Sequence, residues 1–254
     1  MKIIVCCKIV PDEQEIQVLP NNELDLSKAS WKISQYDLNA IEASKKLANE
    51  TSGTLTALSV GNSSALESSK IRKDILSRGP DELSLVIDDS HMFSDSLETA
   101  KSIVNALKGS DGFDVVLCGT GSGDIYSQEV GIQIGALLDI PTINNVTDIT
   151  VKGDILEVER TLEDEVEVLE VPLPAVLSVS SDINVPSVPA MKEIMRAGKK
   201  PIHVLEVPLS EVTPSVKQLS QLVPEQQERR MEIIEGDNGE AVEALYQFLK
   251  KEIL

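Results

Sequence analysis

The sequence predicts an α/β fold, with a parallel sheet flanked by helices, an antiparallel meander that extends the sheet, and a C-terminal arm. Two observations predict the parallel part. Short apolar or β-branched runs recur four times, and a helix-length segment separates each run from the next. The third observation is that, from residue 146 onward, breaks of only three residues separate the apolar runs. Such short breaks predict an antiparallel meander. Buried parallel strands need helices on both faces of their sheet.

The expected parallel strands are continuous apolar runs, as strands buried on both faces usually are. They lie at residues 2–7, 54–60, 82–87 and 113–118. The segments between them begin at an Asp or a Ser, the residue types that accept backbone hydrogen bonds at helix starts. We expect helices at residues 37–49, 63–78 and 94–108, and a further helix at 125–138 that ends before Pro141.

The expected meander has strands at residues 146–151, 155–162, 166–171 and 175–179. Lys152-Gly-Asp154 and Glu163-Asp-Glu165, which separate the first three, are typical of hairpin turns. Glutamates recur along these strands, and we expect them to form a solvated face that protects the sheet edge.

The last third of the chain changes character. A Pro-rich segment at residues 184–191 leads into a basic stretch at 192–200, and a polar, Gln-rich region follows residue 207. We expect a short strand at 231–235 and a closing helix at 239–253. The chain thus divides into a domain of residues 1–205 and an arm of residues 206–254, which is too small to fold alone and must pack on its own domain or on another subunit.

The composition disfavours several classes of function. The 254 residues include 42 acidic and 23 basic side chains, and a net charge of −19 repels nucleic acid and anionic lipid surfaces. Aromatic residues make up only 3%, which leaves few platforms for stacking bases. No apolar run approaches the about 18 residues of a membrane span. We expect a cytoplasmic protein with no membrane insertion and no nucleic-acid partner.

Residues for nucleophilic catalysis are missing from the sequence. The three cysteines, Cys6, Cys7 and Cys118, fit neither a disulfide framework nor a zinc site. No Ser/His/Asp or Cys/His constellation and no nucleophile elbow occurs. We therefore expect no catalytic residue and no bound metal.

One glycine-rich segment follows a predicted buried strand and leads into a predicted helix. Gly119, Gly121 and Gly123 let the backbone approach a ligand, and the helix start offers unpaired N–H groups. The segment matches neither the dinucleotide fingerprint nor a Walker A loop. The residues alone leave two alternatives, a cradle for phosphate and an ordinary strand-to-helix turn.

The order of motifs along the chain resembles the β subunit of electron transfer flavoproteins, over nearly its whole length. The resemblance rests on the opening Lys2–Asp12, the segment Ile33-Ser-Gln-Tyr-Asp-Leu-Asn-Ala-Ile-Glu-Ala43, the strand end Leu58–Gly61, the loop Gly119–Gly131, Leu173-Pro-Ala-Val176 and Ile194-Met-Arg-Ala-Gly-Lys-Lys-Pro201. Together with Ser77-Arg-Gly-Pro-Asp-Glu82, the segment from Ile33 is similar to the branch associated with carnitine and related anaerobic acyl-CoA metabolism.

The resemblance implies a Rossmann-like fold of the adenine-nucleotide α-hydrolase type and a role as an electron carrier rather than an enzyme. It implies a heterodimer in which an α subunit holds the redox-active FAD and receives the C-terminal arm. Electrons would pass from or to an acyl-CoA-type dehydrogenase. The β subunit would hold a second nucleotide, AMP or another FAD.

The resemblance also implies which residues form that second site. They are Cys6, Ile33, Ser34, Gln35, Tyr36, Val60, Gly119, Thr120, Gly121, Ser122, Gly123, Asp124, Ile125, Tyr126, Ser127, Gln128, Glu129 and Val130. Gln128-Glu-Val130 stands where the AMP-type pattern has Asn-Gln-Thr. A valine at position 130 is similar to the pattern of the electron-bifurcating members, which bind a second FAD. Glu129, however, brings a negative charge toward the expected phosphate. The resemblance therefore leaves open whether this site binds AMP or FAD.

A partner-binding loop is implied by the same resemblance. It covers residues 184–200, and Met191 occupies the position of the apolar anchor for partner dehydrogenases, between Pro189 and Lys192. Two other functions are conceivable on the same kind of sheet. An adenine-nucleotide-dependent enzyme would need a catalytic Lys or an ATP-binding loop near the first strand, where Val10-Pro-Asp12 offers neither. A nucleotide-binding sensor would be a flavin-free homodimer.

Overall fold

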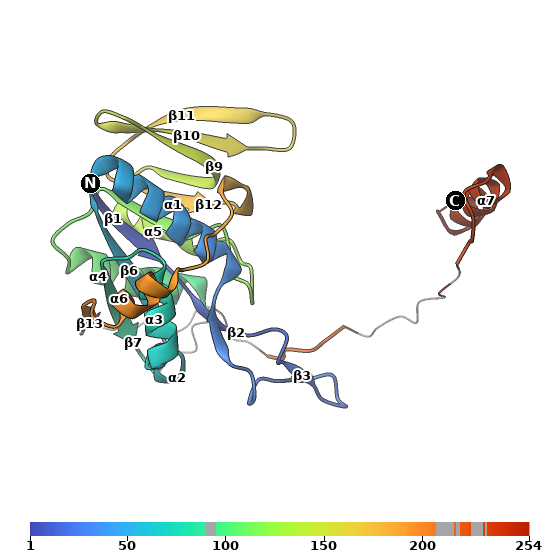
Figure 1. Ribbon diagram of the computed structural model, residues 1–254, viewed down its shortest axis with the longest axis horizontal. Helices are drawn as coiled ribbons and strands as arrows, with labels where there is room; N and C mark the ends of the chain where they lie inside the picture. The colour runs from blue at the N-terminus through green and yellow to red at the C-terminus, as the bar shows by residue number, and fades with distance from the viewer. Residues whose placement is uncertain (90–94, 207–215, 217–218, 225–230, 232, 254) are drawn as a thin grey trace.

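A nine-stranded sheet runs through the centre of the computed structural model, in the order β11-β10-β9-β12-β8-β1-β6-β7-β13 (Figure 1). The structure describes residues 1–89, 95–206, 216, 219–224, 231 and 233–253. The strands are β1 (Lys2–Cys6), β6 (Thr54–Gly61), β7 (Glu82–Ile87), β8 (Val115–Gly119), β9 (Thr142–Lys152), β10 (Ile155–Thr161), β11 (Val166–Pro172), β12 (Ala175–Val179) and β13 (Ile202–Val204). The predicted fold class is confirmed.

The meander prediction is right for three strands and wrong for the fourth. Strand β10 pairs antiparallel with both β9 and β11. Strand β12 instead lies parallel between β8 and β9, inside the sheet. All five of its residues are buried, as a strand covered on both faces requires. Strand β13 was not predicted and adds a parallel edge beside β7.

Helices cover both faces of the sheet. Helices α1 (Gln35–Thr51), α3 (Ser69–Ser77) and α6 (Met191–Ala197) bury apolar side chains in the cluster on one face. Helices α4 (Ser96–Lys108) and α5 (Val130–Leu138) contribute to the cluster on the other face. The carboxyl ends of β1, β6 and β8 therefore open toward the start of α5 and the first turns of α4.

Two predicted helices differ from the structure. The helix expected at residues 63–78 is split into α2 (Ser63–Leu66) and α3, because the Ser68 side chain caps a new helix by accepting a hydrogen bond from the Ile71 N–H. The helix expected from Ile125 begins only at Val130. The start of the helix predicted at 94–108 falls partly outside the described residues, and α4 is described from Ser96.

An excursion between β1 and α1 was not predicted. Residues 9–33 form two small antiparallel pairs, β2 (Ile9–Pro11) with β5 (Trp31–Ile33) and β3 (Gln17–Val18) with β4 (Leu24–Asp25). A short 3₁₀ helix, η1 (Ser181–Ile183), follows β12. Strand β5 ends at Ile33, which places the next residues directly at the start of α1.

The C-terminal arm contains helix α7 (Gly239–Ile253), which confirms the predicted closing helix and stands apart from the sheet in Figure 1. The strand predicted at 231–235 is wrong for the residues described there, since Met231 and residues 233–235 have no strand conformation. Most of the linker before it lies outside the described residues. None of the helices described is both long and apolar enough to cross a membrane.

Candidate functional site

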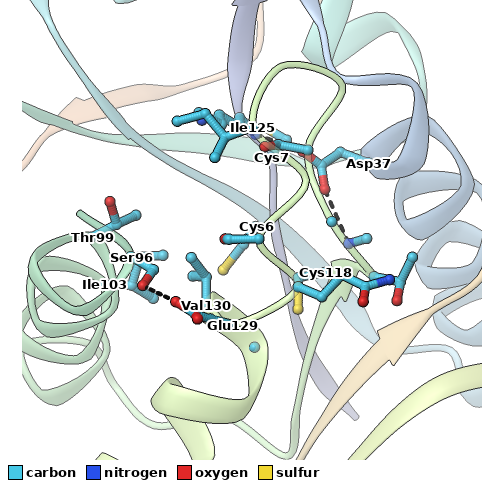
Figure 2. A pocket seen from close by; sticks show the side chains of 18 of the residues that line it. Cys6, Cys7, Asp37, Ser96, Thr99, Ile103, Cys118, Ile125, Glu129 and Val130 are labelled. Carbon is cyan, nitrogen blue, oxygen red and sulfur yellow. Dashed lines mark hydrogen bonds between the residues drawn. The ribbon is translucent and has the colours of Figure 1, made fainter. Parts of the chain in front are cut away.

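A pocket opens at the carboxyl ends of β1, β6 and β8, where helices α4 and α5 begin nearby (Figure 2). Strand β1 and the residues after it supply Cys6, Cys7 and Lys8, and strand β6 supplies Leu58 and Val60. The loop between β8 and α5 supplies seven of the twenty lining residues. The pocket therefore lies where parallel α/β sheets bind their ligands.

The pocket is apolar on one side and polar on the other. Leu58 and Val60 on β6, Ile103 on α4 and Val130 on α5 form the apolar wall. The loop contributes hydroxyl groups from Thr120, Ser122 and Ser127, and the first turn of α5 borders the pocket at Val130 and Gly131. An apolar wall opposite a helix start suits a flat ring joined to an anionic group.

The structure divides the predicted site residues into two groups. Those that line the pocket are Cys6, Val60, Gly119, Thr120, Gly121, Ser122, Ile125, Ser127, Gln128, Glu129 and Val130. Those that do not line it are Ile33, Ser34, Gln35, Tyr36, Gly123, Asp124 and Tyr126. Most residues of the second group make contacts that hold the loop in place and do not face the pocket.

Three contacts hold the outer side of the loop. Lys8 Nζ lies 2.7 Å from an Asp124 carboxylate oxygen. The Gly123 N–H donates to Ser34 Oγ at 3.2 Å, and the Tyr36 and Tyr126 ring centroids are 4.9 Å apart. Ile33 is buried at the end of β5, and Gln35 is exposed on the first turn of α1. The segment predicted to touch the nucleotide thus positions the loop that lines the pocket.

The loop keeps residues 125–129 out of the helix. Tyr126 and Gln128 adopt left-handed conformations, with φ of 54° and 60°. Such conformations are uncommon for residues other than glycine, and they concentrate at functional sites where the surrounding contacts enforce them. They explain why α5 begins five residues later than predicted.

Asp37 is the most important pocket residue that was not predicted from the sequence. Its side chain is buried in the first turn of α1 and borders the pocket. One carboxylate oxygen accepts the Lys8 N–H at 2.8 Å and the other accepts the Gly119 N–H at 3.0 Å. Burial raises the pKa of Asp37 to about 7, although the two hydrogen bonds act in the opposite direction. Its position next to the Ile33–Tyr36 segment was the only signal.

The three cysteines are free and buried. Burial raises the pKa of Cys6, and that of Cys118 to about 12 despite its contact with Ser178. Burial likewise raises the pKa of Cys7. Neutral buried thiols are poor nucleophiles. Cys6 and Cys118 therefore serve as small, uncharged parts of the pocket floor (Figure 2).

Glu129 faces the pocket and reaches across to α4. The Ser96 hydroxyl donates to its carboxylate at 2.5 Å (Figure 2). Gln133 Nε2 in turn donates to Ser96 Oγ at 3.1 Å. Residues that line the pocket but were not predicted are Cys7, Lys8, Asp37, Leu58, Ser96, Thr99, Ile103, Cys118 and Gly131. Ser96, Thr99 and Ile103 belong to an ordinary amphipathic helix, so no local pattern marks them.

Charge in the site is unbalanced. Among the residues lining the pocket, Lys8 is the one cation, and Asp124 neutralises it. Partial burial acts to raise the pKa of Asp124, but the charge and hydrogen bond of Lys8, together with hydrogen bonds from Ser122 and the Ile125 backbone, outweigh it and leave the pKa lowered. Two further carboxyl groups, Asp37 and Glu129, border the pocket. Neutral donors therefore have to provide much of the attraction for an anion here.

A comparison with protein families matches residues 23–210, most of the chain, to the electron transfer flavoprotein domain. The match contains the loop after β8, the wall from β6 and α4, and Asp37. The chain therefore belongs to the electron transfer flavoprotein domain family.

Proposed function

We propose that this chain is the β subunit of a heterodimeric electron transfer flavoprotein and that its pocket holds an adenine nucleotide, AMP or a second FAD. The observation that carries the proposal is the loop from Gly119 to Val130, which lines a pocket at the carboxyl edge of the sheet beside a helix start. The family match agrees with this position. The chain would act as an electron carrier rather than as an enzyme.

The residues present fit such a nucleotide. The apolar wall of Leu58, Val60 and Ile103 suits the adenine ring, and the hydroxyls of the loop suit the ribose and phosphate. A side chain at Gly131 would overlap Ser178 and Cys118, so only glycine lets the first turn of α5 lie this close to β8 and β12. Free N–H groups at that turn favour an anion.

A bound flavin would supply the one- and two-electron chemistry of the pair. The residues of this chain would hold and orient the nucleotide. Its apolar wall would keep water from the ring, and the Lys8–Asp124 pair would keep the loop closed on its outer side. The nucleotide in this pocket is AMP if its role is structural and FAD if it carries electrons.

The segment after β12 supports docking of a dehydrogenase. Val185, Val188 and Met191 have exposed fractions of 91%, 89% and 72%. Exposed apolar groups gathered on one segment are typical of binding surfaces. The segment is fixed on α1, because the Asn39 and Asn184 side-chain amides each donate to the other's backbone carbonyl, at 2.8 and 3.0 Å.

Polar contacts fix this exposed segment, and a basic side chain lies beside its apolar residues. The Ser187 hydroxyl donates to Glu42 at 2.6 Å, which adds a second attachment to α1. Glu193 accepts the Ala190 N–H at 2.6 Å and so sets the start of α6 at Met191. Pro189 precedes this start, and Lys192 is exposed beside Met191. A partner with an apolar socket and acidic neighbours would fit this surface.

Helix α7 supports docking of the arm on an α subunit. Val242, Leu245, Tyr246 and Leu249 expose between 44% and 63% of their surface. A helix with this much exposed apolar surface gains stability by packing against another protein surface. Residues 1–205 would then form the nucleotide-binding unit, and residues 206–254 the link to the α subunit.

The substitution Ser127→Asp tests the proposed pocket. Ser127 is exposed at the pocket lining, so the new carboxylate should leave the fold intact while repelling a phosphate group. We expect AMP or FAD to bind at least tenfold more weakly, equivalent to about 1.4 kcal/mol. Calorimetric titration of the full chain measures this, with Ser27→Asp, an exposed position after β4, as the matched control. Equal affinity in the two variants would show that nucleotides bind elsewhere.

A further inference from the structure

Asp37 joins the two strand ends that lie under the pocket. Lys8 follows β1 and Gly119 ends β8, and each donates its backbone N–H to a different carboxyl oxygen of Asp37, at 2.8 and 3.0 Å. Asp37 itself is only 5% exposed and lies in the first turn of α1. One carboxyl group therefore fixes both strand ends to α1.

The close approach of Gly119 to Asp37 leaves no room for a side chain at position 119. A Cβ atom at Gly119 would lie 2.7 Å from the Tyr36 side chain and 2.8 Å from the Asp37 carboxyl group. No side chain can stand between the loop and the carboxyl group. A change in the charge of Asp37 is thus felt directly at the N–H where the pocket loop begins.

The groups around Asp37 make a poor setting for an added anion. The Lys8 ammonium on the β1 side is paired with Asp124 of the loop. Cys6 at the end of β1, Cys7 directly after it and Cys118 on β8 are buried thiols, which stay neutral. Glu129 lies at the other side of the pocket, bound to Ser96. One cation thus stands against three carboxyl groups before any phosphate enters.

We propose that Asp37 is a proton-linked positioning residue, which takes up a proton from solvent when a phosphate-bearing nucleotide binds in the pocket. The inference rests on the proposed function and adds to it the regulation of the same site. The step is a simple protonation, in which the carboxylate gains one proton and no electron moves. Protonation of Asp37 removes one negative charge under the pocket when the phosphate adds negative charge above it.

The direction of the pH effect follows from where Asp37 titrates. Its pKa of about 7 means that the carboxyl group is partly protonated near neutral pH. A nearby phosphate stabilises the protonated form further, since like charges disfavour ionisation. Nucleotide affinity should therefore fall as pH rises through 7, because binding then requires a proton that the free protein has lost.

The test is calorimetric titration of the full chain with AMP and with FAD at pH 6, 7 and 8. Titrations in two buffers of different ionisation enthalpy also give the number of protons taken up. From pH 6 to pH 8 we expect the affinity of the wild type to fall about fivefold more than that of Asp37→Asn, since one group changes affinity by at most about tenfold per pH unit. We also expect the wild type to take up more protons at pH 7. Comparing the variants cancels the titration of the AMP phosphate itself.

Asp139→Asn is the matched control. Asp139 is exposed and ends α5 in a left-handed conformation with φ of 55°, which asparagine tolerates. This variant should keep the wild-type pH profile. A merely structural role for Asp37 would lower affinity in Asp37→Asn by the same factor at every pH, and that result would overturn the inference.

An infrared measurement covers the case in which Asp37→Asn does not fold. Addition of AMP to wild-type chain labelled with ¹³C at the aspartate carboxyl groups should increase the protonated carboxyl band at pH 7. An unchanged band while AMP binds would overturn the inference and leave the proposed function intact. If neither nucleotide binds at any pH, both the proposed function and the inference are wrong.

Discussion

Replacing Gly131 by alanine should lower the free energy of unfolding by about 1–3 kcal/mol and weaken nucleotide binding. An added Cβ would overlap Ser178 Oγ on β12 and would lie 2.7 Å from Cys118 Sγ on β8. Helix α5 must then move away from the sheet at the very turn that borders the pocket. Chemical denaturation and nucleotide titration of the same variant measure both effects.

Two further variants make this test specific. Gly123→Ala introduces the same methyl group into the loop that precedes α5, at a position where no atom outside the neighbouring residues lies within 4 Å of it, and should be nearly neutral. Ser178→Ala removes the oxygen that Gly131→Ala meets first, so the double variant should regain part of the lost stability. The packing account of Gly131 would be wrong if Gly123→Ala cost as much as Gly131→Ala, or if the double variant were no more stable than Gly131→Ala alone.

Met191→Ala should slow electron transfer from the partner dehydrogenase about tenfold or more, which corresponds to the loss of an interface contact worth at least about 1.4 kcal/mol. Met191 exposes its side chain at the start of α6, on a segment that Asn39 and Glu42 hold against α1. The substitution removes an apolar contact and leaves this attachment in place. Stopped-flow reduction of the αβ pair by the dehydrogenase measures the rate.

The flavin content and the stability of the Met191→Ala protein should equal those of the wild type, because the side chain has few contacts within the chain. Val166→Ala is a suitable comparison, since Val166 is 56% exposed on β11, which lies at the opposite edge of the sheet from β13. It should leave transfer unchanged. Unaltered transfer kinetics in Met191→Ala would remove this segment as the docking site.

The parallel core of the fold could be predicted because its strands are continuous apolar runs. The position of β12 could not, since a buried strand after a proline-rich turn can join a meander or return to the middle of a sheet. Its complete burial separates the two cases, and burial is a property of the folded chain. The edge strand β13 is only three residues long and leaves no periodic pattern.

The candidate site shows the same division. The loop after β8 could be found from its glycines and its place between a strand and a helix. The late start of α5 could not, because left-handed backbone at Tyr126 and Gln128 depends on contacts made by Lys8, Ser34 and Tyr36 far away in the sequence. Asp37 resembles a helix-start acid in the sequence, and only the fold brings it to both strand ends.

The nucleotide content of the protein purified together with its α subunit decides whether the pocket is a nucleotide site. We expect two bound nucleotides per αβ pair, either two FAD molecules or one FAD and one AMP, released on denaturation and identified by chromatography. Ser127→Asp should lose one of the two and keep the other. A pair that carries a single nucleotide, unchanged by Ser127→Asp, would show that the pocket beside Gly119–Val130 holds none and would rule out the proposed nucleotide site.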